Sequence, residues 1–238
     1  MRTTFKTWLR RVTAGLLLIL PFAAHAQAPK EGEDPKIGFI RLVNAVAPGT
    51  GNAHLEIDGE DQFPKGYKLG QRTGGIGLKA GSKKIKVTRE GVIEGTTTIT
   101  LGVGETMNLV AFAEKMPAEG DKPERWEMRI LKLKQRDVEK GYRLTVLSVC
   151  KEPETLFSTL TEGDDGKKTA HSAKRLMTTS VELGERPKDL AVFARASDVP
   201  LAVFRPDTKG NYVVVLYDDP DGTVKAVSFF DPKFVIAG

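Results

Sequence analysis

Cysteine is almost absent from this chain of 238 residues, which contains only Cys150. A single cysteine cannot form an internal disulfide bond, so the fold must be stable without such cross-links. Cys150 ends an alternating run that begins at Tyr142, and a small buried hydrophobic residue near a strand end is the simplest role there. A reactive or intermolecular thiol is the alternative, but no neighbouring histidine or basic cluster favours it.

Motifs that carry catalysis are also missing. The chain has no Gly-x-Ser-x-Gly, His-Glu-x-x-His or Cys-x-x-Cys sequence, which removes the usual arrangements of nucleophile, base and metal ligand. His54 and His171 are the only histidines after residue 26, and each is expected to be a surface or hydrogen-bonded residue. Glu152 and Glu154 have the spacing of solvated charges on a strand edge, which disfavours a glycosidase pair. We predict no enzymatic activity, and no catalytic, cofactor-binding or metal-binding residue.

Long apolar segments are missing as well, and the apolar run near the amino terminus is short. Four basic residues precede an apolar run from Ala14 to Phe22, and the small residues Ala24 and Ala26 follow it. A membrane-spanning helix needs about 20 apolar residues. The order of basic, apolar and small residues predicts a signal peptide over residues 1–26, cleaved before Gln27, with an uncleaved anchor as the alternative. We expect a periplasmic or secreted protein with no membrane span after cleavage.

The excess of basic charge belongs largely to that segment. Without its four basic residues, 32 Lys and Arg remain against 31 Asp and Glu. A nucleic-acid partner requires a strongly basic surface, and Lys83-Lys84-Ile85-Lys86 is the best candidate. Lys84 and Lys86 alternate with Ile85 and Val87, as on the solvent face of a half-buried strand. We therefore expect no nucleic-acid partner.

What the chain does contain is a series of short alternating or β-branched runs separated by Gly, Pro and Asp, with no convincing helical period. The predicted strands are 37–45, 52–58, 75–79, 83–89, 94–101, 105–114 and 124–134, then 142–150, 155–161, 168–183, 188–196, 199–205, 211–218 and 223–231. The polar segment from Gln135 to Gly141 predicts a boundary. The fold class is therefore all-β, with two tandem immunoglobulin-like antiparallel β-sandwich domains over residues 36–134 and 141–238. We expect each domain to fold separately.

The two halves resemble each other at their ends. Each opens with an alternating strand, Phe39–Asn44 in the first half and Tyr142–Leu147 in the second. Each closes with a hairpin of two alternating strands, and the two hairpins are about 105 positions apart. The pairs of strands are Thr106–Phe112 with Trp126–Leu133, and Asn211–Tyr217 with Val224–Phe230. This pattern predicts a tandem duplication.

Two loops have compositions that suggest a ligand. The stretch Gly70–Gly77 is rich in glycine, but it lacks the spacing, the lysine and the following helix of a phosphate-binding loop. A tight turn or bulge is the favoured interpretation. The segment Asp218–Gly222 contains three carboxylates that suit calcium, while an Asp-Gly hairpin tip explains the same residues without a metal. We favour the turn in both places, and we expect no cofactor.

Aromatic residues make up only 7% of the chain, which limits any aromatic-lined binding surface. Trp126, Tyr212 and Tyr217 are the candidates for a sugar-binding surface. Because side chains alternate along a strand, Tyr212 and Tyr217 lie on opposite faces, so at least one of them belongs to the core.

Two sequence segments resemble secreted bacterial β-sandwich repeats of unknown function. They are Leu42-Val43-Asn44-Ala45 and the segment Leu78–Val87, which contains Ala80-Gly81 and ends with Ile85-Lys86-Val87. The layout of the whole chain resembles the periplasmic accessory proteins of alginate O-acetylation, with Asp189–Phe193 and Tyr212–Phe230 as the matching parts of the second domain. The resemblance implies an accessory role, with envelope proteins or an acetylation complex as partners, in export or O-acetylation of an exopolysaccharide. It brings no catalytic residue.

Export, β-repeats and missing catalytic motifs together favour an accessory interaction protein of the cell envelope. A carbohydrate-binding or surface-adhesion module is the second interpretation, which a cleft lined by aromatic residues would favour. A hydrolase or acetyltransferase is the third, and it would require a clustered nucleophile, base and oxyanion donor.

Overall fold

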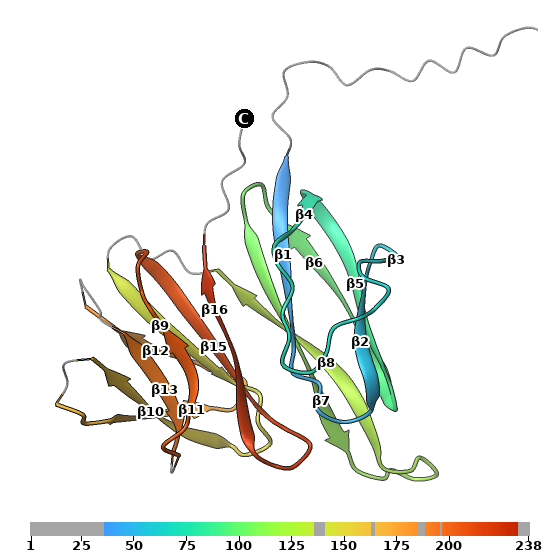
Figure 1. The fold of residues 1–238 in the computed structure, drawn as a ribbon. Helices are drawn as coiled ribbons and strands as arrows, with labels where there is room; N and C mark the ends of the chain where they lie inside the picture. The colour runs from blue at the N-terminus through green and yellow to red at the C-terminus, as the bar shows by residue number, and fades with distance from the viewer. Residues whose placement is uncertain (1–35, 136–140, 163–164, 185–188, 196, 233–238) are drawn as a thin grey trace, which may run out of the picture. The chain divides into compact units, whose positions relative to one another are not determined.

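The structure is a computed structural model that describes residues 36–135, 141–162, 165–184, 189–195 and 197–232. Within these ranges the protein is all-β, with sixteen strands and no helix (Figure 1). None of the described segments is a helix long and apolar enough to cross a membrane. The expected signal peptide, residues 1–26, lies outside the described residues.

The first half of the chain forms one hydrogen-bonded set of eight strands in the order β3-β2-β5-β6-β8-β7-β1-β4. Strands β6 and β8 pair through a single residue pair, Ile93 with Glu127. That sparse link separates a group β3-β2-β5-β6 from a group β8-β7-β1-β4. The strands are β1 (Ile37–Asn44), β2 (Thr50–Ile57), β3 (Glu60–Asp61), β4 (Ile76–Lys79), β5 (Gly81–Glu90), β6 (Val92–Leu101), β7 (Thr106–Met116) and β8 (Arg125–Lys134).

The second half forms two four-stranded sheets, in the orders β11-β10-β13-β14 and β12-β9-β15-β16. Raising each strand number of the first half by eight gives the same neighbours in the second half, except that the β6–β8 pair has no counterpart between β14 and β16. The strands are β9 (Tyr142–Ser148), β10 (Glu154–Thr161), β11 (Thr169–Lys174), β12 (Thr178–Glu182), β13 (Leu190–Ala194), β14 (Pro200–Phe204), β15 (Gly210–Asp218) and β16 (Val224–Asp231).

The expectation of purely antiparallel sheets is wrong. Strand β1 runs parallel to β7, and β9 runs parallel to β15. In each half, five strands lie between the two parallel neighbours along the chain. A connection of that length allows parallel neighbours, whereas a tight hairpin enforces antiparallel ones. The two closing hairpins, β7–β8 and β15–β16, are antiparallel as predicted.

Most predicted strands have observed counterparts, with two exceptions in detail. The strand predicted over 168–183 is two strands, because the chain turns at Arg175–Met177, where Leu176 has φ of 60°. The two-residue strand β3 was not predicted. The predicted strand 188–196 corresponds to β13, and residues 188 and 196 lie outside the described residues.

The lysine-rich strand is half-buried, as its alternation predicts. Ile85 and Val87 are fully buried, whereas Lys86 forms ion pairs with Glu56 and Glu94 on the outer face of the sheet. Lys83 of the same strand forms an ion pair with Asp58, so two of the basic side chains of β5 have acidic partners.

Buried apolar side chains form three clusters, and one of them joins the two halves. The first cluster contains residues of the first half only, and the third contains residues of the second half only. The second cluster, called here the seam core, combines both halves and includes Val43, Val110, Leu147, Val215 and Phe229. The faces of β1, β7, β9, β15 and β16 that are not turned to their own cores therefore pack against each other.

A buried polar group also joins the halves beside the seam core. The Arg41 guanidinium donates to Asp231 and to Asn108, each at 3.2 Å. Asn108 Nδ2 donates to the other Asp231 oxygen at 3.1 Å, and the Arg41 guanidinium lies 4.7 Å from the Phe229 ring centroid. Burial raises the pKa of Asp231, and these hydrogen bonds oppose that change. Charges buried this deeply need partners, so Asp231 ties the last strand of the second half to the first half.

Candidate binding pocket

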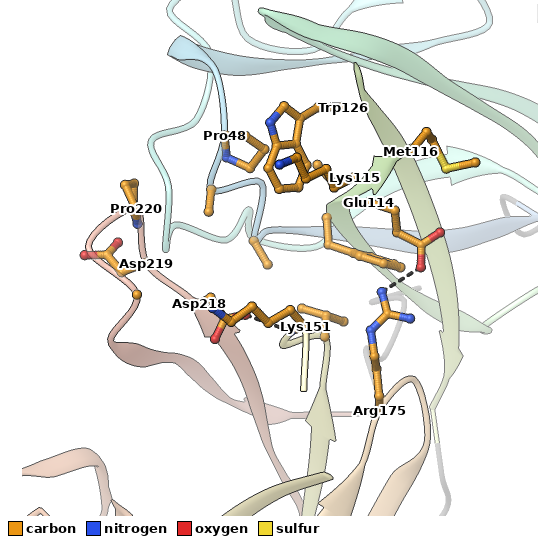
Figure 2. Close-up of a pocket in the computed structure, with 16 residues that line it drawn as sticks. Pro48, Glu114, Lys115, Met116, Trp126, Lys151, Arg175, Asp218, Asp219 and Pro220 are labelled. Atoms are coloured by element: carbon orange, nitrogen blue, oxygen red, sulfur yellow. Dashed lines mark hydrogen bonds and ion pairs between the residues drawn. The ribbon is translucent and has the colours of Figure 1, made fainter. Parts of the chain in front are cut away.

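A pocket of about 680 Å³ lies where the two halves meet, and both contribute residues to it (Figure 2). Pockets of 300 to 1,000 Å³ are typical of ligand sites. Six chain segments form it: the loop after β1, the end of β7, the start of β8, the loop after β9, the turn after β11, and the β15–β16 hairpin. We call it the seam pocket.

The apolar part of the seam pocket comes mostly from the first half. Pro48, Phe112, Met116 and Trp126 line it, and Pro220 adds an apolar edge from the second half. Trp126 is 36% exposed, which is high for so large an apolar side chain. Figure 2 shows Trp126 and Pro48 facing Asp218 and Lys151 across the opening. The pocket therefore offers an indole face to whatever enters it.

An ion pair closes one side of the pocket and crosses between the halves. Arg175 Nη2 donates to Glu114 Oε1 at 2.6 Å, and Arg129 Nε donates to Glu114 Oε2 at 3.0 Å. Arg175 Nε also donates to the Cys150 carbonyl at 3.0 Å. The pKa of Glu114 is lowered chiefly by the hydrogen bond from Arg175. This carboxylate is therefore held charged and in place.

The opposite side of the pocket carries two charged side chains, Lys151 and Asp219, that form no such ion pair with a described residue. Asp218 Oδ2 accepts a hydrogen bond from the Lys151 backbone N–H at 2.7 Å, which fixes the loop after β9. The Lys151 ammonium and the Asp219 carboxylate form no ion pair with any described residue. Lys151 is exposed and Asp219 half-buried, and both line the pocket. These two groups are thus available to a ligand.

The aspartate-rich segment forms a hairpin turn that is held by backbone hydrogen bonds and by the Asp221 side chain. Asp219 N–H donates to the Thr223 carbonyl, and Gly222 N–H to the Asp219 carbonyl, each at 2.8 Å. Asp221 Oδ1 accepts from both the backbone and the hydroxyl of Thr223. Across the described residues, no three His, Cys, Asp or Glu side chains are grouped as metal ligands. The turn interpretation fits this geometry.

The glycine-rich stretch lies along the outer edge of β1. Its backbone bonds to β1 through Gly70 N–H to the Asn44 carbonyl and Asn44 N–H to the Gln71 carbonyl, each at 2.9 Å. Gly70 has φ of 79°, and a Cβ placed there would lie 2.6 Å from the Tyr217 hydroxyl oxygen. Glycine at position 70 is therefore required both by the backbone and by close contact with the second half.

The two histidines lie far apart in chain position and in different sheets. His54 Nδ1 is 3.6 Å from Asp61 Oδ2 on the half-exposed side of β2. His171, on β11, shares a 2.9 Å hydrogen bond with the Thr159 hydroxyl and stacks on Phe157. Burial lowers the pKa of His171. Neither histidine lines the seam pocket.

The remaining candidate residues separate into buried and exposed positions. Tyr212 and Tyr217 are both buried, Tyr212 in the third core and Tyr217 in the seam core. They lie on opposite faces of β15, as predicted, and neither is an exposed platform. Cys150 is buried in the third core, and burial raises the pKa of its thiol. Glu152 and Glu154 are exposed, as their spacing indicates.

Two parts of the pocket are recognisable in the sequence: Trp126 through its aromatic character, and Asp218 to Gly222 as a turn rich in carboxylates. Glu114, Lys151 and Arg175 belong to no motif and meet only through folding. Comparisons with models of known protein families and with curated proteins found no match.

Proposed function

We propose that this protein is an exported, non-catalytic accessory protein of the cell envelope that acts by binding another molecule in the seam pocket. The observation that carries this proposal is the pocket itself. It combines an exposed indole, Trp126, with the Lys151 and Asp219 charges that have no ion-pair partner among the described residues. Tryptophan is among the side chains that contribute most to binding energy at protein interfaces.

A non-catalytic role agrees with the composition of the pocket. Nucleophilic catalysis requires a hydroxyl or thiol next to a base. The described residues that line the pocket include no serine, threonine, cysteine or histidine. The Thr159–His171 pair lies elsewhere, on β10 and β11. The chemistry available in the pocket is therefore hydrogen bonding, ion pairing and apolar contact.

The domain organisation is part of the same proposal. We infer two tandem immunoglobulin-like sandwiches over residues 36–134 and 141–238 that follow a signal peptide over residues 1–26. The corresponding strand order of the two halves, which differs only in the single β6–β8 link, supports a duplication, as do the separate first and third cores. The seam core shows that the copies also share buried surface. The seam pocket then lies at the junction of the two repeats.

The proposed arrangement of a signal peptide followed by two β-domains supports a specific process for the protein. Its similarity in layout to accessory proteins of alginate O-acetylation suggests a periplasmic or secreted protein that assists export or acetylation of an exopolysaccharide. Its partners would then be envelope proteins, with neither nucleic acid nor a membrane span involved. A pocket formed jointly by two repeats suits such a role, because a partner would contact both repeats at once.

A carbohydrate-binding module is the alternative, and one observation favours it. A pyranose ring can stack on the Trp126 indole while its hydroxyls bond to Asp219 and Lys151 across the pocket. The two alternatives differ in the ligand that the purified protein should bind. If the protein is a carbohydrate-binding module, a saccharide alone should bind without any protein partner.

Complementation of a deletion strain tests the proposal, scored for polymer export and acetylation and checked for equal protein level. Trp126→Ala should abolish the phenotype, whereas Phe63→Ala should not, because Phe63 is another exposed aromatic residue outside the pocket. His54→Gln, His171→Gln and Cys150→Ala should retain it.

Two results would contradict the proposal. The first is full function of a stable Trp126→Ala variant. The second is loss of function in a stable, well-expressed His171→Gln variant, which would move attention to the Thr159–His171 pair and to catalysis.

A further inference from the structure

We propose that the seam pocket binds an extended peptide segment of a partner protein, which adds as a strand beside β7 at residues Ala113 to Lys115. This inference rests on the proposed function, because it assumes that the seam pocket is the binding site. It goes further in naming the class of partner and the atoms that hold it.

The neighbour of β7 ends before β7 does. Strand β1 pairs with β7 from Thr106 to Ala111, while β7 itself continues to Met116. On its other side β7 is paired with β8 along its whole length from Met107 to Met116. The last bond on the β1 side is from Ala45 N–H to the Ala111 carbonyl at 2.8 Å. Beyond this bond the chain after β1 turns away, and the seam pocket opens beside β7.

The direction of the backbone groups follows from the bonds at either edge. The Glu105 carbonyl accepts from Phe39 of β1 and the Ala111 carbonyl from Ala45 just after β1, whereas the Thr106 carbonyl accepts from Gln135 just after β8. Because successive residues of a strand direct their groups to opposite edges, odd-numbered residues of β7 face the β1 side. The amide and carbonyl groups of Ala113 and Lys115 therefore face the open edge. No described loop or turn residue bonds to them.

An open edge of this kind binds a peptide by adding a strand. Main-chain hydrogen bonds supply the affinity, and pockets for alternate side chains supply the selectivity. Strand edges in soluble proteins are normally covered or protected. This one is short and recessed in a pocket, which restricts it to a slender extended chain. A saccharide lacks the regularly spaced N–H and C=O groups that such an edge matches.

The two walls of the pocket determine which kinds of peptide side chain would fit. Trp126 pairs across the ladder with Lys115, so one face of an added strand would meet the indole and Pro48. The other face would meet the seam side, where Glu114 and Arg175 are already paired and Lys151 is not. We therefore expect alternating apolar and charged residues, with an acidic side chain opposite Lys151.

A substitution within β7 tests the strand addition directly. Ala113→Pro removes the N–H that faces the open edge and leaves the bonds to β8 in place, since proline is tolerated at strand edges. Ala113→Ser retains the N–H and serves as the matched control. Complementation should fail with Ala113→Pro and succeed with Ala113→Ser, at equal protein level and equal denaturation midpoint. Function retained by a folded Ala113→Pro variant would overturn the inference.

Binding to the purified chain beginning at Gln27 gives a second measurement. Trp126 is its only tryptophan, since the other is Trp8, so its fluorescence reports on the pocket alone. The probe is a six-residue peptide alternating valine and glutamate, with both ends blocked. We expect a saturable change in emission that Ala113→Pro weakens at least tenfold, about 1.4 kcal/mol. Lys151→Gln should weaken it as well.

The outcomes separate this inference from the proposed function. If Trp126→Ala abolishes function and Ala113→Pro does not, the pocket is the site but strand addition is wrong. If both variants retain function, the proposed function fails too. A saturable response to a neutral oligosaccharide that persists in Ala113→Pro, without a response to the peptide, would overturn the peptide in favour of a sugar.

Discussion

Replacing Leu147 by alanine should destabilise both halves of the molecule, although Leu147 belongs to the second. Its side chain is fully buried in the seam core, on β9. The substitution removes about three carbon groups at about 0.8 kcal/mol each, and an unfilled cavity adds to that loss. The total expected cost is about 3 to 4 kcal/mol of unfolding free energy, within the range measured for buried leucines.

Trp126 makes the effect on the first half measurable. In the chain that begins at Gln27, urea unfolding followed by tryptophan fluorescence reports on the first half, while far-ultraviolet circular dichroism reports on all sheets. If the seam core stabilises both halves, Leu147→Ala lowers the midpoint seen by both probes. Leu144→Ala, on the same strand but in the third core, is the matched control and should affect the second half more strongly.

One result would refute this reasoning. If Leu147→Ala leaves the Trp126 transition unchanged while circular dichroism shows a separate, earlier loss of structure, the halves unfold independently. The prediction that residues 36–134 and 141–238 fold separately would then gain support, since each half would be stable without its share of the seam core.

Three further predictions concern individual contacts. In a double-mutant cycle, Glu114→Gln and Arg175→Met should show a coupling of about 1 kcal/mol near neutral pH, as expected of a partly exposed pair. The pKa of Glu114 is lowered in the folded state, so the stabilisation by the ion pair is present above the unfolded-state pKa of Glu114 and is lost as the pH falls through its folded-state pKa. A coupling energy that persists in acid would contradict this prediction. Gly70→Ala should cost at least about 1 kcal/mol through its positive φ, and adding Tyr217→Phe should restore part of that loss in the denaturation midpoint by removing the hydroxyl it would meet. Cys150 should react slowly with a thiol reagent in the native protein and quickly in denaturant, because burial raises its pKa; equal rates would show that the thiol is accessible.

Strand positions were predictable because alternation reflects burial directly. Ile85 and Val87 are fully buried because the period of two places both on one face of β5, and the same rule put Tyr212 and Tyr217 on opposite faces. The turn within 168–183 had no comparable signal. Leu176 adopts a positive φ of 60° without the glycine or asparagine that usually indicates such a conformation.

The seam pocket could not be predicted from local patterns. Glu114 and Arg175 are 61 positions apart, and their pairing depends on how the two halves pack. Trp126 was recognisable only as an aromatic residue in an alternating strand, which describes core residues equally well. The open edge of β7 follows from where β1 ends relative to β7, and that register is a property of the folded sheet.

The seam core also determines when the newly made chain becomes safe from aggregation. Chains emerge with the amino-terminal part first, so Val43 and Val110 are made long before their neighbours on β15 and β16. Arg41 and its partner Asp231 are 190 positions apart in the sequence. Contacts between such distant parts of a chain form slowly, and apolar surface left uncovered in the meantime attracts other unfinished chains. The aggregation-prone interval therefore ends only when β16 becomes available to fold, and not when the first half is complete.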